Sequence, residues 1–140
     1  MNGMDVGQLL KAYGAAGATM FALDLVWLGV VAKAFYAKHM GTLLRPDVRW
    51  GAALLFYAVY VLATVVFVVL PAAERQSLSR ALLLGGFFGF AAYATYDLTS
   101  LALIRDFPLA VVVVDLAWGT VLTAAAASAG YLAAAWWRLS

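Results

Sequence analysis

Four long apolar stretches constrain the fold of this chain more than any other feature of its sequence. They cover about residues 9–32, 50–70, 81–104 and 108–132, and each supplies the roughly 20 apolar residues that a helix needs to cross a bilayer. The chain is 66% hydrophobic and 11% charged, and a domain of 140 residues buries too little surface to hide such an excess. Because backbone polar groups inside lipid must find partners within the protein, the sequence predicts an all-α, four-helix transmembrane bundle.

The polar segments between these stretches indicate one integral membrane domain over 1–140, with both termini on the same side of the membrane. The first helix lacks a basic leader, so we expect it to be retained and not cleaved as a signal peptide. Loop 33–49 mixes charged and apolar residues, and part of it is predicted to lie at the interface as a short amphipathic helix. Pro71 marks the end of the second helix, a serine such as Ser77 can cap the third, and Trp136, Trp137 and Arg138 predict an aromatic belt.

Several classes of site and partner are disfavoured by what the sequence contains. It has no cysteine and a single histidine, His39, which argues against thiolate or histidine metal sites and against a cysteine nucleophile. A net charge of +2 without a basic run gives no reason to expect a nucleic-acid partner. We therefore expect no cofactor and no metal, and the lipid bilayer as the main partner.

Three of the predicted helices carry a lone acid at a similar depth. Asp24, Asp97 and Asp115 each lie seven or eight residues from the helix end that borders loop 33–49 or the turn at 105–107. At a rise of about 1.5 Å per residue, all three lie roughly 11 Å inside the same face of the bundle. Acids within membrane helices usually face the bundle interior and serve a function, so we expect the three carboxyl groups to face one shared site.

Other polar residues occur at the same level. Gly85, Gly89, Tyr93 and Asp97 are spaced four apart and share one helix face, and the glycines predict close approach by a neighbouring helix. The tetrapeptide pattern D-L-x-W occurs twice, at 24–27 and at 115–118. The binding residues predicted around the acids are Tyr57, Tyr93, Tyr96, Ser100, Trp27, Trp118 and Arg105.

Three classes of function fit this pattern. In the first, a polar pocket within the membrane binds or processes a lipid or small amphiphile, with the acids as acid/base or cation-binding groups and Arg105 in a basic rim. In the second, the same acids serve a proton- or cation-coupled carrier or channel, which at this size would need to form an oligomer. In the third, the chain is a non-catalytic partner subunit whose acids bond its helices together. The sequence contains no familiar catalytic motif, and leaves open whether the protein is an enzyme.

The chain also resembles a known family along most of its length. The segments DLVWLGVVAKAFY (24–36), WGAALLFYAVY (50–60), ATYDLTSLA (94–102) and VVDLAWGT (113–120) resemble small multi-pass membrane proteins grouped as domain-of-unknown-function family 2177. The resemblance implies a four-helix protein of the bacterial cytoplasmic (inner) membrane and carries no activity, substrate or cofactor. Ser100 departs from the family pattern, which has asparagine there.

Overall fold

The computed structural model describes residues 4–139, with side chains described up to residue 135. The described part is 87% helical and has no strands, and it holds four helices long and apolar enough to cross a membrane: Val6–Val31, Trp50–Glu74, Leu78–Leu103 and Leu109–Ala135. The predicted all-α transmembrane architecture is confirmed. Trp136, Trp137 and Arg138 are predicted to form an aromatic belt, but their side chains are not among those that the structure describes.

The first membrane helix consists of an α-helical part followed by a π-helical turn. Helix α1 (Val6–Val26) begins at Asp5, whose side chain accepts from the Gln8 backbone N–H while the Gln8 side chain bonds back to the Asp5 backbone. It continues as the π-helical turn η1 (Trp27–Val31), closed by a bond from the Ala32 N–H to the Trp27 carbonyl. The short helix α2 (Lys33–Met40) and the 3₁₀ turn η2 (Gly41–Leu43) follow, so a short helix is present where the sequence predicts one.

The second membrane helix is longer than predicted because Pro71 does not end it. Helix α3 (Trp50–Thr64) passes through a second π-helical turn, η3 (Val65–Val69), into α4 (Leu70–Glu74). In an α-helix a proline removes one hydrogen bond and clashes with the carbonyl four residues earlier. The wider turn instead pairs the Leu70 N–H with the Val65 carbonyl, and Pro71 then occupies the first turn of α4, where no N–H is required.

The other two membrane helices form a tight hairpin. Helix α5 (Leu78–Leu103) is capped by Ser77, whose hydroxyl accepts from the Arg80 N–H at 3.2 Å, which confirms the predicted serine cap. Helix α6 (Leu109–Leu139) packs along it. A Cβ placed on Gly89 would lie 2.1 Å from the Gly119 carbonyl oxygen. The glycine spacing therefore permits the close helix approach that the sequence predicts.

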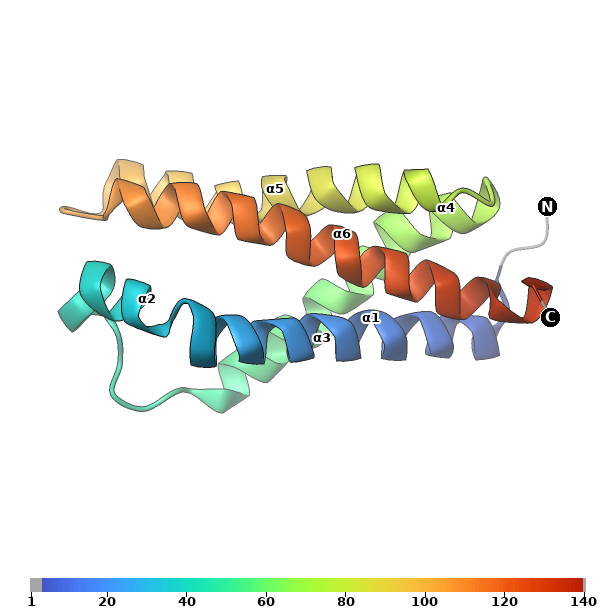
Figure 1. The fold of residues 1–140 in the computed structure, drawn as a ribbon, viewed down its shortest axis with the longest axis horizontal. Helices are drawn as coiled ribbons and strands as arrows, with labels where there is room; N and C mark the ends of the chain where they lie inside the picture. The colour runs from blue at the N-terminus through green and yellow to red at the C-terminus, as the bar shows by residue number, and fades with distance from the viewer. Residues whose placement is uncertain (1–3, 140) are drawn as a thin grey trace.

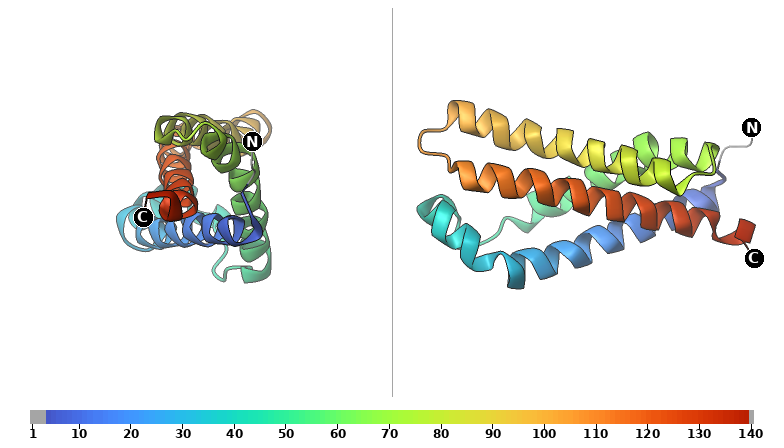
Figure 2. Two further views of the ribbon diagram at one scale, coloured as in Figure 1. Left: turned by 90° about the vertical axis from the view of Figure 1, so that its right-hand side faces the viewer. Right: turned by 45° about the horizontal axis from the view of Figure 1, so that its top comes forward.

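The four membrane helices surround a narrow core and separate from one another at one end of the bundle. Figure 2 (left) shows them around a four-sided cross-section, and α3 runs obliquely from beside α1 toward α5 (Figure 1). The start of α1 and the end of α6 lie at one end of the bundle, here called the terminal end. The other end carries α2 and the turn at residues 104–108 and is called the loop end, where α1 diverges from the α5–α6 hairpin and α2 turns back toward it (Figure 2, right).

Small side chains form much of the core, and large apolar ones face outward. Ala12 and Ala16 of α1 and Ala126 and Ala127 of α6 are fully buried, so these two helices pack closely along their alanine-rich faces. Apolar side chains on the outer faces are widely exposed, for example Phe87 at 71%. A surface of this kind suits acyl chains and not water.

Candidate functional site

Asp24 connects three membrane helices. Its carboxylate accepts a hydrogen bond from the Tyr57 hydroxyl of α3 at 2.5 Å and another from the Trp118 indole N–H of α6 at 2.9 Å. The Asp24 side chain itself is 8% exposed. Charge-assisted bonds of this kind are among the stronger hydrogen bonds in proteins. The acid that interrupts the first apolar stretch thus has two donors from other helices.

Asp115 is bonded from outside the membrane helices, by a residue of α2. The Tyr36 hydroxyl donates to the Asp115 carboxylate and accepts from the Trp27 indole N–H at 3.2 Å. Burial, together with the bond to Asp115, raises the pKa of Tyr36 above its ordinary value. The phenol therefore keeps its proton at neutral pH and remains a hydrogen-bond donor.

The two tryptophans join these two bonded groups into one unit. The Trp27 and Trp118 rings stack with centroids 4.4 Å apart and planes 6° from parallel. Each belongs to one copy of the D-L-x-W pattern, and each serves the other copy: Trp118 bonds directly to Asp24, and Trp27 reaches Asp115 through Tyr36. The repeated four letters thus form a reciprocal pair across α1 and α6.

Asp97 differs from the other two acids because it has no hydrogen-bond partner among the described residues. Its side chain is 0% exposed, and neither carboxylate oxygen is bonded. It lines a cavity of about 460 Å³ together with Asp115, Tyr93, Tyr96 and aromatic residues of α3. A buried polar atom without a partner requires an explanation, such as a strained, catalytic or ligand-binding role.

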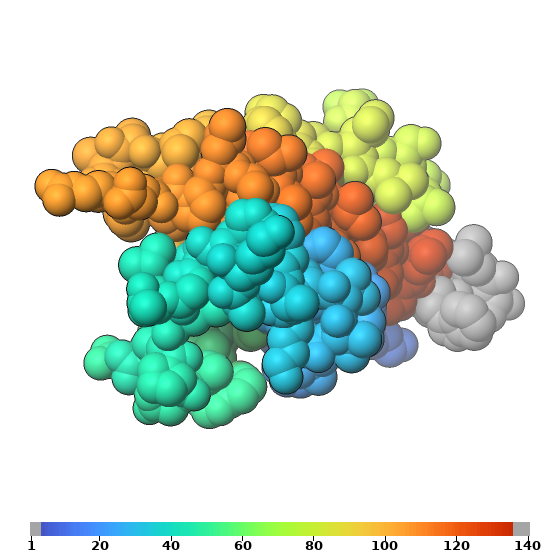
Figure 3. Space-filling model, turned by 60° about the vertical axis from the view of Figure 1, so that its left-hand side comes forward, coloured from blue at the N-terminus to red at the C-terminus, as the bar shows by residue number. Residues whose placement is uncertain are grey.

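A larger cavity of about 560 Å³ opens at the loop end beside the first one. The two hydrogen-bonded acids line it, and α2 contributes one wall. Its lining includes Asp24, Trp27, Leu28, Lys33, Tyr36, Ala37, Met40, Leu44, Tyr57, Val111, Asp115 and Trp118. Asp115, Phe56, Tyr93 and Tyr96 line both cavities. Figure 3 shows the face at this end, where α2 lies between the α5–α6 hairpin and the start of α3.

We call the cavity lined by Asp24 and α2 the outer cavity, and the cavity lined by Asp97 the inner cavity. The inner cavity exists because α3 diverges from α5 toward the loop end, which leaves Phe56 and Tyr60 facing Tyr93 and Asp97 across a space. Gly119 brings the Tyr93 ring close to α6, because a Cβ there would lie 2.3 Å from Tyr93 Cγ.

Most, but not all, of the predicted binding residues lie around these cavities. Tyr57, Tyr93, Tyr96, Trp27 and Trp118 line one or both. Ser100 is buried on α5 but lines neither, and Arg105 is exposed in the turn before α6, also outside both linings. The cation that does line the outer cavity is Lys33. Asp24 and Asp115 line the outer cavity, and Asp97 and Asp115 line the inner one. In the described residues no group of three acids or histidines could hold a metal ion.

Tyr36 belongs to the candidate site, although the sequence pattern does not indicate it. The sequence predicts that Tyr36 lies in the interfacial loop, yet its hydroxyl contacts an acid 79 positions away. The Phe35, Tyr36 and Met40 side chains pack against Phe107, Val111 and Val112, so α2 folds back onto the start of α6. The signal available in the sequence is the aromatic pair at 35–36 among charged residues.

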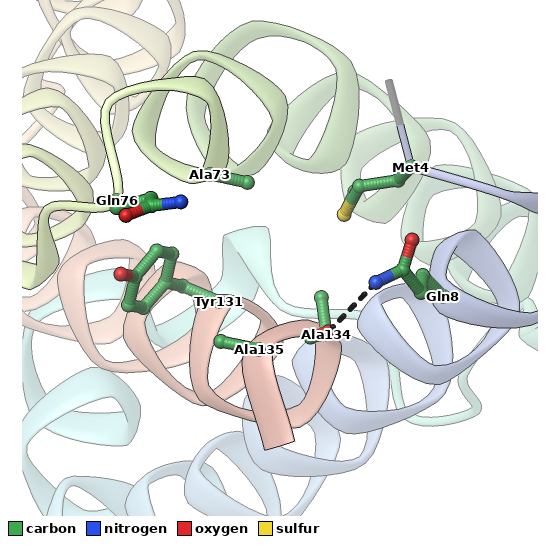
Figure 4. A pocket seen from close by; sticks show the side chains of 7 residues that line it. All are labelled: Met4, Gln8, Ala73, Gln76, Tyr131, Ala134 and Ala135. Carbon is green, nitrogen blue, oxygen red and sulfur yellow. Dashed lines mark hydrogen bonds between the residues drawn. The ribbon is translucent and has the colours of Figure 1, made fainter. Parts of the chain in front are cut away.

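A third cavity lies at the terminal end. It measures about 400 Å³ and is lined by Met4, Gln8, Ala73, Gln76, Tyr131, Ala134 and Ala135 (Figure 4). The Gln8 amide donates to the Ala134 carbonyl at 3.4 Å. The lining of this third cavity contains no charged side chain. Because the cavity is also far from Asp24, Asp97 and Asp115, it adds nothing to the chemistry of the loop end.

Comparison with known protein families gives a match over most of the chain. The family described as predicted membrane protein, domain-of-unknown-function family 2177, has a model that matches residues 9–132. Searches of curated proteins and of solved structures find no significant match. The matched range begins within α1, ends within α6 and includes Asp24, Asp97 and Asp115. The chain therefore belongs to the membrane protein family DUF2177.

Proposed function

We propose that this protein binds a lipid or small amphiphile in the outer cavity at the loop end. The observation that carries the proposal is the combination of the Asp24 and Asp115 bonded groups with an open space of about 560 Å³ beside them. Small-molecule sites are typically concave spaces of about 300–1,000 Å³ with apolar walls and a few placed polar groups. The outer cavity has that size and composition.

The distribution of polarity around the cavity supports an amphiphilic ligand. The lining combines carboxylates and phenols with the apolar side chains of Leu28, Met40, Leu44 and Val111. Leu28 is also 53% exposed on the outside of the bundle. An acyl chain could therefore enter from the lipid while its polar end reaches the carboxylates. We place this site in a bacterial cytoplasmic membrane, as the family resemblance suggests.

The terminal half of the bundle favours a one-sided pocket over a proton pathway across the membrane. The buried side-chain hydrogen bonds there include the 2.8 Å bond between the Tyr60 and Thr123 hydroxyls and the bond from Thr64 to the Tyr60 carbonyl. No carboxylate lies between this level and Asp5 or Glu74 at the helix ends. A relay through the terminal half would lack carboxylates, so the carrier alternative has weaker support.

Covalent labelling with a photoactivatable alkyl amphiphile tests the proposal. The purified protein in neutral detergent should be labelled saturably in α2 and in the segment 111–118. Ala37→Trp places a large ring in the outer cavity, since Ala37 lines it, and should reduce this labelling at least about tenfold. Ala34→Trp is the matched control, because Ala34 is exposed on the same helix and lines neither cavity.

The outcomes separate the three classes of function. Labelling spread evenly over the lipid-facing surface, and unchanged by Ala37→Trp, would contradict the pocket. If Ala37→Trp also prevented assembly with a co-purifying membrane protein while Ala34→Trp did not, the partner-subunit alternative would gain support. Proton-driven uptake by vesicles containing the protein would favour the carrier.

Tyr36→Phe should loosen α2 without unfolding the bundle. The change removes the donor to Asp115 and the acceptor for Trp27, a loss of about 1–3 kcal/mol, but keeps the apolar contacts of α2 with α6. Because the chain has no cysteine, a thiol introduced as Met40→Cys reports access to the cavity wall. We expect its modification by a polar thiol reagent to become several times faster in the Tyr36→Phe background. A Thr42→Cys reporter in η2, which is already exposed, should change little. Equal rates with and without the Tyr36 hydroxyl would show that the bond does not hold α2 in place.

A further inference from the structure

The unpartnered carboxylate of Asp97 restricts the chemistry of the ligand. We infer that the inner cavity binds a cationic headgroup, an ammonium carried by an alkyl chain, between Asp97 and Asp115. This inference rests on the proposed function, since the alkyl chain would occupy the outer cavity. Asp24 already has two donors and Asp115 has one, whereas Asp97 has none among the described residues.

The acid is placed where a bound cation would have the largest effect. Asp97 is 0% exposed, and a buried charge without a partner is costly, whereas an opposite charge beside it offsets part of that cost. An ammonium group provides the opposite charge, and one that carries N–H groups also provides the donors that the two Asp97 oxygens lack. A neutral or anionic headgroup would leave that carboxylate unpaired or repel it.

The walls of the inner cavity favour an organic cation over a bare metal ion. Phe56, Tyr60, Tyr93 and Tyr96 surround the two carboxylates, and aromatic faces attract ammonium groups with estimated energies of about 0.5–2 kcal/mol. The volume of about 460 Å³ exceeds what a dehydrated ion needs. In addition, the part of the chain that the structure describes holds no cluster of three acids or histidines suited to a metal.

The connection between the cavities explains how one molecule could use both. Asp115, Phe56, Tyr93 and Tyr96 line the inner and the outer cavity alike. A headgroup beside Asp97 would therefore leave its chain directed along the outer cavity toward Met40 at the end of α2 and Leu44 after η2. Lys33, the cation on the outer wall, is positioned away from the inner lining and would not repel the ammonium there.

Competition between headgroups tests the inference. An alkylammonium, an alkyltrimethylammonium, an alkyl carboxylate and an alkyl glucoside with equal chain lengths would compete against the photoactivatable amphiphile for the wild-type protein in neutral detergent. We expect the two cationic probes to compete at concentrations at least about tenfold lower than the others. Asp97→Asn should abolish that preference. Asp106→Asn is the control, because Asp106 is an exposed acid in the turn before α6.

Thermal stability gives a second readout that a structural role for Asp97 would not produce. Without ligand, Asp97→Asn should be as stable as the wild type or more stable, because it removes a buried carboxyl group that has no hydrogen-bond partner among the described residues and lies beside a second acid in the inner cavity. The alkylammonium should raise the melting temperature of the wild type and leave that of Asp97→Asn unchanged. A marked loss of ligand-free stability in Asp97→Asn would overturn the inference.

The remaining outcomes distinguish the inference from the proposal beneath it. If all four probes compete equally and Asp97→Asn has no effect, the ammonium assignment is wrong while the amphiphile pocket stands. If none of them competes and labelling is not saturable, the proposed function itself fails. If sodium chloride at moderate concentration displaces the alkylammonium from the wild type and from Asp106→Asn alike, while its partition into protein-free micelles is unchanged, the inner cavity binds an inorganic cation and the headgroup assignment is overturned.

Discussion

Gly89→Ala is expected to prevent α5 and α6 from packing as they do in the native bundle. The added methyl group would lie 2.1 Å from the Gly119 carbonyl oxygen and 2.6 Å from the Thr123 hydroxyl. Because the nearest atom belongs to the backbone of a helix, no side-chain rotation removes the overlap. The helices must separate, and we expect a loss of about 3 kcal/mol or more in the free energy of unfolding.

A matched glycine on the same helix provides the control for this change. A Cβ on Gly86 would meet Thr120 Cγ2 at 3.5 Å, which is ordinary van der Waals contact. Gly86→Ala should therefore be neutral or slightly stabilising, since alanine favours a helix. Melting temperatures of the detergent-solubilised variants measure both effects. Similar melting temperatures for the two variants would contradict the close approach of α5 and α6 at Gly89.

Asp24→Ala is expected to have the second large effect, because it removes the acceptor shared by two helices. The Tyr57 hydroxyl and the Trp118 indole N–H would each lose their partner. Leaving a buried donor unpaired costs about 1–3 kcal/mol, so we expect a total loss of about 2–4 kcal/mol. Asp24→Asn, which keeps one carbonyl oxygen, should lie between alanine and the wild type.

A double-mutant cycle shows whether this loss comes from the bonds themselves. Tyr57→Phe removes one of the two donors, and in its presence Asp24→Ala leaves only the Trp118 N–H unpaired. The double variant should therefore be less destabilised than the sum of the single variants. Reversible unfolding in mixed micelles gives the required free energies. Strictly additive losses of stability would mean that Tyr57 and Asp24 do not interact, although 2.5 Å separates the Tyr57 hydroxyl from the Asp24 carboxylate oxygen.

Much of the fold could be predicted from the sequence because lipid imposes a simple requirement. A segment of about 20 apolar residues must be a helix that satisfies its own backbone, so the four helices follow from composition alone. The glycines at 85 and 89 indicate a close helix contact for a similar reason: nothing larger fits between two helix backbones. Pro71 misled the prediction of the second helix end, since the compensating π-helical turn at Val65–Val69 leaves no mark in a run of valines.

The depth of the three acids in the membrane could be predicted from the sequence, but the hydrogen-bond partner of each acid could not. Counting residues places Asp24, Asp97 and Asp115 at one level, because the rise per residue of a helix is fixed. Which donor meets which acid depends on the rotation of each helix about its axis and on its tilt, and neither is encoded in spacing. Tyr36 reaches Asp115 only because α2 folds back onto α6, a tertiary contact outside the range of any local pattern.

The π-helical turn at Trp27–Val31 has a consequence for how this chain can vary. A π turn accommodates one residue more than an α-helix of the same length. Deleting a single residue between 27 and 31 would therefore restore regular winding and leave everything beyond it in nearly the same rotation about the axis. If the same five residues were instead wound as a regular α-helix, everything beyond them would rotate by about 100° relative to α1. Tyr36 would then swing away from Asp115, although no residue that forms the bond had been replaced. The chain can therefore shorten by one residue here more easily than it can lose the wide turn.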